Sequence, residues 1–371
     1  MEETRDYTAL MIAAAKGDWE IEKALIDAGA DVNARGYGEV TPLMVAAGIG
    51  VDKAVQVLLD AGSDVRLKDD NGVQALGIAA EKGHINTVKL LIKYGSPIDE
   101  IQGNGGTSLM AAVQAGHKDV VQVLLDAHAK VDIVSTTNDV TALMLAAWKG
   151  NSEIVDLLVK YGADVNQANP EGVTALAAAV QEDKIKIVPL LITHGAKIDF
   201  EYYNTTTKQY ETPLICASWF GYTDIARILI EKGAKINRIT KDGCIAIHGT
   251  AQNGHYDTVS LLINMGADVN IKSAIGSTAI MLAAWRSHSD VVKLLIDHGA
   301  SVNYTTKTNV TPLFVAIDQD SIESVRYLLR AGANPNVKAM LDGKNYTNLG
   351  YAKERELTDI VDLLVQYGAK D

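Results

Sequence analysis

Apolar and polar positions along the chain repeat with a period of about 33 residues. Each period carries a leucine or isoleucine in the same place, and successive markers are 33 to 38 residues apart. The eleven markers are Leu10, Leu43, Leu76, Leu109, Leu143, Leu176, Leu214, Ile247, Ile280, Leu313 and Leu349. Because eleven such units fill nearly all of the 371 residues, the pattern predicts one repeat array over residues 1–371, with no separate domain.

Each unit predicts two helices joined by a turn. A threonine stands two residues before the marker in nine of the eleven units, where its hydroxyl can cap a helix N-terminus. Pro42, Pro213 and Pro312 then occupy the first helical position. Small residues follow, and a glycine seven residues after the marker ends the first helix in most units. A second apolar-periodic stretch, such as residues 154–159, leads to an extended, hairpin-like link.

These columns resemble the ankyrin repeat over nearly the whole chain, most closely at residues 311–313 and 266–270. One departure is that the histidine expected after the leucine occurs only at His248. The resemblance implies an all-α fold with short hairpin-like loops, an ankyrin-repeat α-solenoid. Residues 337–371 fit a C-terminal capping repeat, because residues 353–356 are charged where inner repeats have Ala and Gly.

The composition narrows the class of protein. The net charge of −12 argues against nucleic acid as the main partner, since phosphate contacts need clustered Lys and Arg. No apolar run approaches the roughly 18 residues of a membrane span, so we expect no membrane insertion. Two cysteines form no disulfide framework, and the first residues contain no apolar signal segment. We therefore expect an intracellular location, foremost the cytoplasm, with the nucleus as the alternative.

Residues that could perform chemistry fall in phase with the repeat. His84, His117, His255 and His288 all stand eight residues after a marker, which favours a role in the scaffold. The two commonest zinc signatures are absent. The glycine-rich stretch 103–106 lacks the lysine of a phosphate-binding loop. We therefore predict no catalytic residues, no metal, no cofactor and no enzymatic activity.

Function is instead expected where the repeats differ from one another. The resemblance implies a concave face, made of first helices and loops, on which partners usually bind. Two positions that should face it hold Trp148-Lys149, Trp219-Phe220 and Trp285-Arg286 in the fifth, seventh and ninth units. Tryptophan is enriched in binding hot spots. Two interpretations remain open: these rings contact a partner, or they pack flat against the neighbouring first helix.

The longest link, residues 198–211, contains five additional residues and four aromatic side chains. Alternation of Phe200 and Tyr202 predicts a projecting two-stranded finger. On this finger, Tyr202, Tyr203 and Tyr210 are predicted to clamp a bound segment. The alternative is an insertion that the surface merely tolerates.

The links also differ in charge along the chain. Links 98–106, 131–140, 165–173 and 198–211 carry net charges of −2, −2, −1 and −2. The later links 236–244, 269–277, 302–310 and 335–346 carry +1 each. If these links line one edge of the binding face, the change in the sign of their charge could orient an elongated partner. The alternative is that the charges are solvated and vary from link to link by chance.

Together these patterns predict a non-catalytic protein–protein interaction module or adaptor, acting as a monomer or within a hetero-complex. Trp148, Trp219, Phe220 and Trp285 would anchor a protein partner of unknown identity. The alternative is a permanent structural subunit of a larger assembly, in which binding would not localise to one face.

Overall fold

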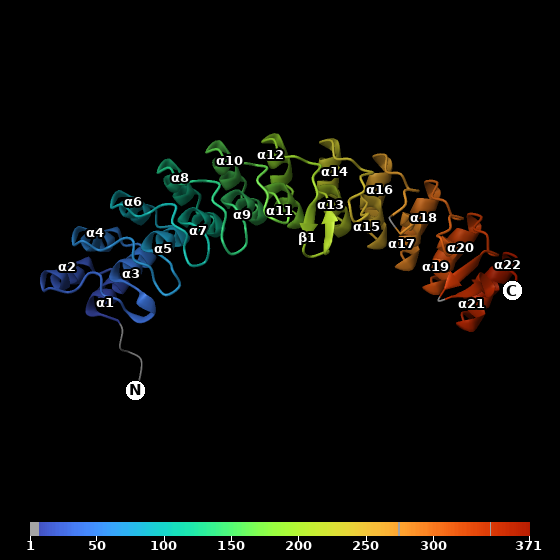
Figure 1. The fold of residues 1–371 in the computed structure, drawn as a ribbon, viewed down its shortest axis with the longest axis horizontal. Coiled ribbons are helices and arrows are strands. Elements are labelled where there is room, and N and C mark those ends of the chain that lie inside the picture. The colour runs from blue at the N-terminus through green and yellow to red at the C-terminus, as the bar shows by residue number, and fades with distance from the viewer. Residues whose placement is uncertain (1–6, 274, 342) are drawn as a thin grey trace, which may run out of the picture. The chain divides into compact units, whose positions relative to one another are not determined.

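The computed structural model describes residues 7–273, 275–341 and 343–371. These residues form 22 α-helices, one 3₁₀ turn and two short hairpins (Figure 1). The chain divides into two compact units, an N-terminal unit of Met1–Pro170 with Thr174–Ala196 and a C-terminal unit of Glu171–Val173 with Lys197–Asp371. The single repeat array over residues 1–371 remains a prediction.

The N-terminal unit consists of six helix pairs. They are α1 (Ala9–Lys16) and α2 (Trp19–Asp27), α3 (Pro42–Ile49) and α4 (Asp52–Asp60), α5 (Ala75–Lys82) and α6 (Ile85–Lys93), α7 (Ser108–Ala115) and α8 (Lys118–Asp126), α9 (Ala142–Lys149) and α10 (Ser152–Lys160), and α11 (Ala175–Gln181) and α12 (Ile187–Thr193). The 3₁₀ turn η1 spans Tyr37–Glu39.

The C-terminal unit consists of five helix pairs and both hairpins. They are β1 (Tyr202–Asn204) and β2 (Gln209–Glu211), α13 (Pro213–Phe220) and α14 (Thr223–Glu231), α15 (Ala246–Gln252) and α16 (Tyr256–Asn264), α17 (Ala279–Trp285) and α18 (Ser289–Asp297), α19 (Pro312–Asp318) and α20 (Ile322–Arg330), β3 (Lys338–Leu341) and β4 (Lys344–Thr347), and α21 (Asn348–Glu354) and α22 (Thr358–Gln366). In both units each helix packs on its partner and on the equivalent helices of adjacent pairs.

The predicted helix caps are confirmed. In eight of the eleven first helices, the threonine hydroxyl accepts a hydrogen bond from the backbone N–H three residues later. Pro42, Pro213 and Pro312 open their helices as expected. Thr278 precedes α17 but its side chain makes no cap bond. The residues that delimit first helices therefore follow directly from local sequence.

The in-phase histidines join consecutive repeats, as the scaffold interpretation requires. His117 Nε2 lies 2.9 Å from the carbonyl oxygen of Glu81, at the end of the preceding first helix. Its ring covers Gly83, where an added Cβ would lie 2.7 Å from ring atoms. Gly83 has φ of +79°, a conformation that only glycine adopts without strain. His255 repeats this arrangement over Gly221 in the C-terminal unit.

A second bridge between repeats is an asparagine amide in the links. Asn270 Oδ1 accepts from Ser301 N at 2.8 Å, and its Nδ2 donates to the Gly299 carbonyl at 3.0 Å. Asn237, Asn303 and Asn336 make the equivalent pair of bonds. One side chain thus fixes the link of the next repeat at two backbone atoms, which sets the register between units.

The long link forms the predicted finger. β1 and β2 pair antiparallel, with Tyr203 opposite Tyr210. A second hairpin, β3 with β4, was not predicted, although its link contains three additional residues. Asp342, which the charge count of that link included, lies outside the described residues.

The N-terminal repeat contains a buried acid that its sequence pattern did not reveal. Glu22 on α2 is fully buried, and its carboxylate has no hydrogen-bond partner among the described residues. The equivalent second-helix position holds valine in nine other repeats, for example Val55 and Val88. Burial, with a smaller contribution from nearby Asp18, raises the pKa of Glu22 from 4.5 to about 7.

This pKa predicts a stability that falls as pH rises. The folded state holds the proton up to about pH 7, whereas the unfolded chain releases it near 4.5. The contribution of the protonated Glu22 carboxyl to the free energy of unfolding is therefore complete below pH 4.5 and is lost as pH rises to 7. Glu22→Val should raise the free energy of unfolding at pH 8 by about 2–3 kcal/mol and flatten this profile. The free energy of unfolding is measured at each pH by urea titration. Unfolding is followed by the fluorescence of Trp19, with the other tryptophans replaced by Phe.

The matched control for that experiment is Glu20→Val, because Glu20 is an exposed acid on the same helix. It should leave the pH profile of unfolding unchanged. A Glu22→Val protein that still loses stability between pH 4.5 and 7 to the same extent as wild type would contradict the assignment.

The cap geometry predicts a difference between two equally buried threonines. Thr311 accepts from Phe314 N at 3.0 Å, whereas Thr278 caps nothing. Both are 2% exposed, so loss of the methyl group is comparable. Thr311→Ala should lower the free energy of unfolding by about 1 kcal/mol more than Thr278→Ala. Equal losses in urea titrations would show that the cap contributes nothing.

Candidate partner-binding site

Two of the predicted contact residues are the exposed tryptophans that end first helices. Trp148 on α9 is 42% exposed and Trp285 on α17 is 43% exposed. A cation lies over each ring: Lys149 Nζ is 4.9 Å from the Trp148 centroid, and Arg286 Cζ is 4.2 Å from that of Trp285. Trp148 belongs to the N-terminal unit, and the other predicted contact residues belong to the C-terminal unit.

Trp219 is half-buried because it packs against the next first helix. A Cβ added to Gly249 on α15 would lie only 2.8 Å from Trp219 Cε3. The ring therefore occupies space that this glycine leaves open. Its own backbone carbonyl accepts from Asn253 Nδ2 at 2.8 Å. The packing interpretation therefore holds for this ring, and its role as a partner contact stays a prediction.

Phe220 is also half-buried, and one face of its ring is covered. It stacks on Tyr222, the residue before α14, with ring centroids 5.6 Å apart and an interplanar angle of 20°. Its role as a partner contact stays a prediction.

The outer side of the finger presents two paired tyrosines. Tyr203 and Tyr210 lie directly opposite each other, and their ring centroids are 5.2 Å apart. Lys241, from the next link, places Nζ 3.1 Å from the Tyr210 centroid. Asp242 Oδ2 accepts from Tyr210 N at 2.8 Å, which ties the finger to the next repeat.

The prediction that Tyr202 clamps a partner is wrong. Tyr202 is fully buried, because side chains alternate between the two sides of a strand. Tyr203 faces outward, so Tyr202 and Asn204 face inward together with Glu211. The alternation of Phe200 with Tyr202 was the available signal: it marks one face of the strand, and that face is the buried one.

A buried polar cluster holds the base of the finger. The Glu211 carboxylate accepts hydrogen bonds from Asn204 Nδ2 at 3.0 Å and from the Thr207 hydroxyl. Burial raises the pKa of Glu211. Burial, and then the Glu211 charge, raise the pKa of the Cys216 thiol, so it stays protonated and poorly nucleophilic. Sequence reasoning missed Asn204 and Glu211, since no pattern distinguished them from other loop residues.

A cavity of about 310 Å³ lies beside Trp219 in the C-terminal unit. Its apolar walls include Ile215 and Trp219 on α13 and Leu282 on α17. Gln209, next to Tyr210 on β2, also lines it. Trp285 lies one helical turn beyond Leu282, on the same side of α17. Asp242, whose carboxylate accepts a hydrogen bond from Tyr210 N, lines the cavity as well. We name Tyr203 and Tyr210 of the finger, together with Trp219 and Trp285, the aromatic face.

Cys244 and His248 line this cavity, but neither is poised for catalysis. His248 Nε2 donates to the Ile271 carbonyl at 2.9 Å. Burial lowers the pKa of His248, so the ring is neutral. Burial raises the pKa of Cys244, and its thiol donates to Gln209 Oε1 at 3.0 Å. The lining therefore suits binding, not acid–base or nucleophilic chemistry.

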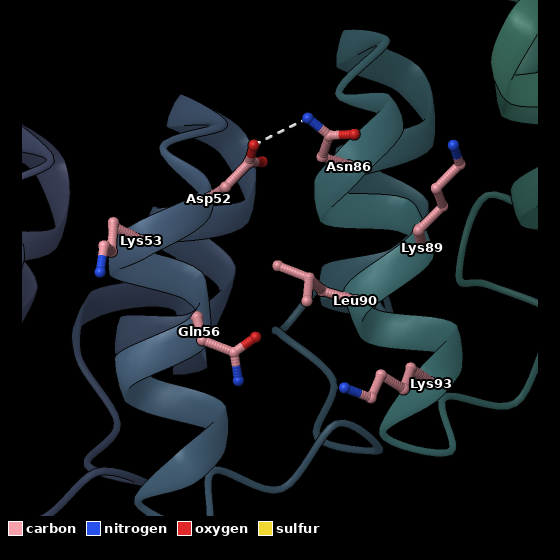
Figure 2. A pocket seen from close by; sticks show the side chains of 7 residues that line it. All are labelled: Asp52, Lys53, Gln56, Asn86, Lys89, Leu90 and Lys93. Carbon is pink, nitrogen blue, oxygen red and sulfur yellow. Dashed lines mark hydrogen bonds between the residues drawn. The ribbon is translucent and has the colours of Figure 1, made fainter.

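A second hollow, of about 430 Å³, lies between the second helices α4 and α6 of the N-terminal unit. Figure 2 shows Lys53 and Lys89 pointing away from the hollow, whereas Gln56, Leu90 and Lys93 point toward it. Asn86 Nδ2 donates to Asp52 at 2.9 Å across the rim. This arrangement is a gap between neighbouring helices and offers no focused set of ligands.

Metal binding and membrane insertion find no support in the part of the chain that the structure describes. These residues contain no group of three or more His, Cys, Asp or Glu side chains placed to hold a metal ion. Within the same residues, every helix is too short or too polar to cross a membrane.

Comparison with known proteins identifies one family. The family model described as ankyrin repeats, in three copies, matches residues 1–69, 43–137, 143–240, 200–273 and 247–339. These matches together cover well over half of the chain. No curated protein matches it.

The Trp219 contact predicts a fluorescence change. Gly249→Ala should push the indole outward, because the new methyl group would overlap the ring. In a variant with Trp219 as the only tryptophan, emission should shift to longer wavelength and acrylamide quenching should increase. Gly48→Ala is the matched control, since Gly48 faces Ile78 on the neighbouring first helix. An unchanged spectrum in the Gly249 variant would contradict the packing described.

Proposed function

The chain belongs to the ankyrin repeat family, and we propose that it is a protein-binding adaptor that holds its partner on the aromatic face of the C-terminal unit. Ankyrin repeats generally mediate protein–protein interaction, and the family is typically non-catalytic. The choice of this surface among those of the two units is our proposal.

The observation that carries the proposal is the cavity beside Trp219. Trp219 lines it, and exposed Trp285 follows one helical turn after the lining residue Leu282. The finger adjoins it through the lining residue Asp242, whose carboxylate accepts a hydrogen bond from Tyr210 N. Aromatic side chains with accessible edges beside a partly apolar hollow are typical of binding hot spots. A side chain of the partner would enter the cavity, while the tyrosines contact its backbone and flanks.

The finger supports the same proposal through its rigidity. Glu211 and Asn204 fix it from inside, and Asp242 ties its backbone to the next repeat. A contact surface that is already ordered loses little conformational entropy when a partner binds. Phe220 and, in the N-terminal unit, Trp148 remain predicted contact residues.

The test compares partners captured from native lysate by three versions of the full chain. One is wild type, one carries Tyr210→Ala with Trp285→Ala, and the control carries Tyr256→Ala with Tyr367→Ala. Tyr256 and Tyr367, on and just after second helices, are 44% and 38% exposed, so the control removes a comparable aromatic surface. Quantitative mass spectrometry should show partners reduced at least tenfold by the Tyr210/Trp285 variant alone.

Two results would contradict the proposal. Partners that are retained by both variants would exclude the aromatic face as the main contact. Partners lost equally from both would indicate an assembly subunit buried over much of its surface. Circular dichroism of each variant, matched to wild type, separates a lost contact from a lost fold.

A further inference from the structure

We infer that the partner segment bound on the C-terminal unit is acidic and extended, with an apolar side chain that enters the cavity beside Trp219. This inference rests on the proposed function and adds the chemistry of the partner. Its basis is the set of charged groups in four consecutive links, residues 198–211, 236–244, 269–277 and 302–310.

All the carboxylates of these links are already engaged. Asp199 accepts from Lys235 N at 3.1 Å, and Glu201 pairs with Arg238 at 3.0 Å. Asp242 accepts from Tyr210 N, and Glu211 lies buried in the finger. The last two links, 269–277 and 302–310, contain no acid. Among the described residues, none of these carboxylates forms an ion pair with a lysine of the same links.

The lysines of the same links are exposed and form no ion pairs. Lys208, Lys241, Lys272 and Lys307 each come from a different link, and none forms an ion pair within the described residues. The result is one lysine without an ion pair in each link, and the three links after the finger carry a net charge of +1 each. Such a charge distribution raises the association rate and favours an oppositely charged partner.

Three cations of the C-terminal unit lie over aromatic rings. Lys241 lies over Tyr210, and Lys272 Nζ is 4.4 Å from the Tyr304 centroid. Arg286 lies over Trp285. A cation over a ring face keeps its charge but loses conformational freedom, so its pairing with a carboxylate costs less entropy. Carboxylates and apolar side chains of one segment could therefore bind side by side.

Two links of the N-terminal unit show the opposite chemistry. Links 98–106 and 131–140 contain four carboxylates and neither lysine nor arginine. An acidic segment would be repelled there, and this difference directs it to the C-terminal unit. The four lysines span three repeat steps, roughly 25–30 Å at the usual spacing of packed helices, which about eight extended residues cover.

The experiment selects ligands without assuming a sequence. A phage-displayed library of random 12-residue peptides is panned against the full chain in low salt. Selected peptides should be enriched in Asp and Glu around one large apolar residue. Their affinities are then measured by fluorescence anisotropy for wild type, for Lys272→Glu with Lys307→Glu, and for the control Lys89→Glu with Lys93→Glu on α6.

We expect the Lys272/Lys307 variant to bind the selected peptides at least tenfold more weakly, and the α6 control to bind them as wild type does. Selection of basic or uncharged peptides, equal weakening by both variants, or no selected peptide at all would overturn the inference. The proposed function has a separate test. If native partners are lost from the Tyr210/Trp285 variant but not from the Lys272/Lys307 variant, the aromatic face is supported as the binding surface. The inference that the partner segment is acidic is then contradicted.

Discussion

The structure depends on contact between equivalent positions of consecutive repeats. A helix pair of this length cannot bury its apolar side alone, so each repeat is completed by the next one. Alanine columns let first helices approach closely, and the histidine over Gly83 fits only because that residue has no side chain. The Asn270 amide then fixes the following link at two backbone atoms. Spacing between repeats is thereby set by backbone geometry.

This constraint decides which departures from the pattern a repeat can accommodate. Trp219 fits because the residue that faces it on the first helix of the next repeat is Gly249, which has no side chain. Trp285 stays partly exposed and holds Arg286 against its ring. The finger is an insertion in a link, where extra residues leave the stacked helices undisturbed. It acquires an internal anchor of its own in Glu211.

Sequence alone predicted the features that recur from repeat to repeat and those that depend only on neighbouring residues in the chain. Markers recur in every unit, and threonine caps and glycine ends recur in most of them; the structure has them where expected. The orientation of Tyr202 was misjudged, because a strand of three residues can present either side until its burial is known. Glu22 escaped notice although it breaks a valine column, and its burial depends on neighbouring helices. The cavity beside Trp219 joins residues from three repeats, which no single motif describes.

The central claim is that a partner contacts the aromatic face of the C-terminal unit. The most direct test places a photo-crosslinking amino acid, p-benzoylphenylalanine, at position 285 or 210 in separate proteins. A third protein carries it at position 256, an exposed tyrosine on the second helix α16. After irradiation in cell extract, the account predicts the same crosslinked partner from positions 285 and 210 and none from 256. A crosslink to that partner from position 256, with none from 285 or 210, would contradict it.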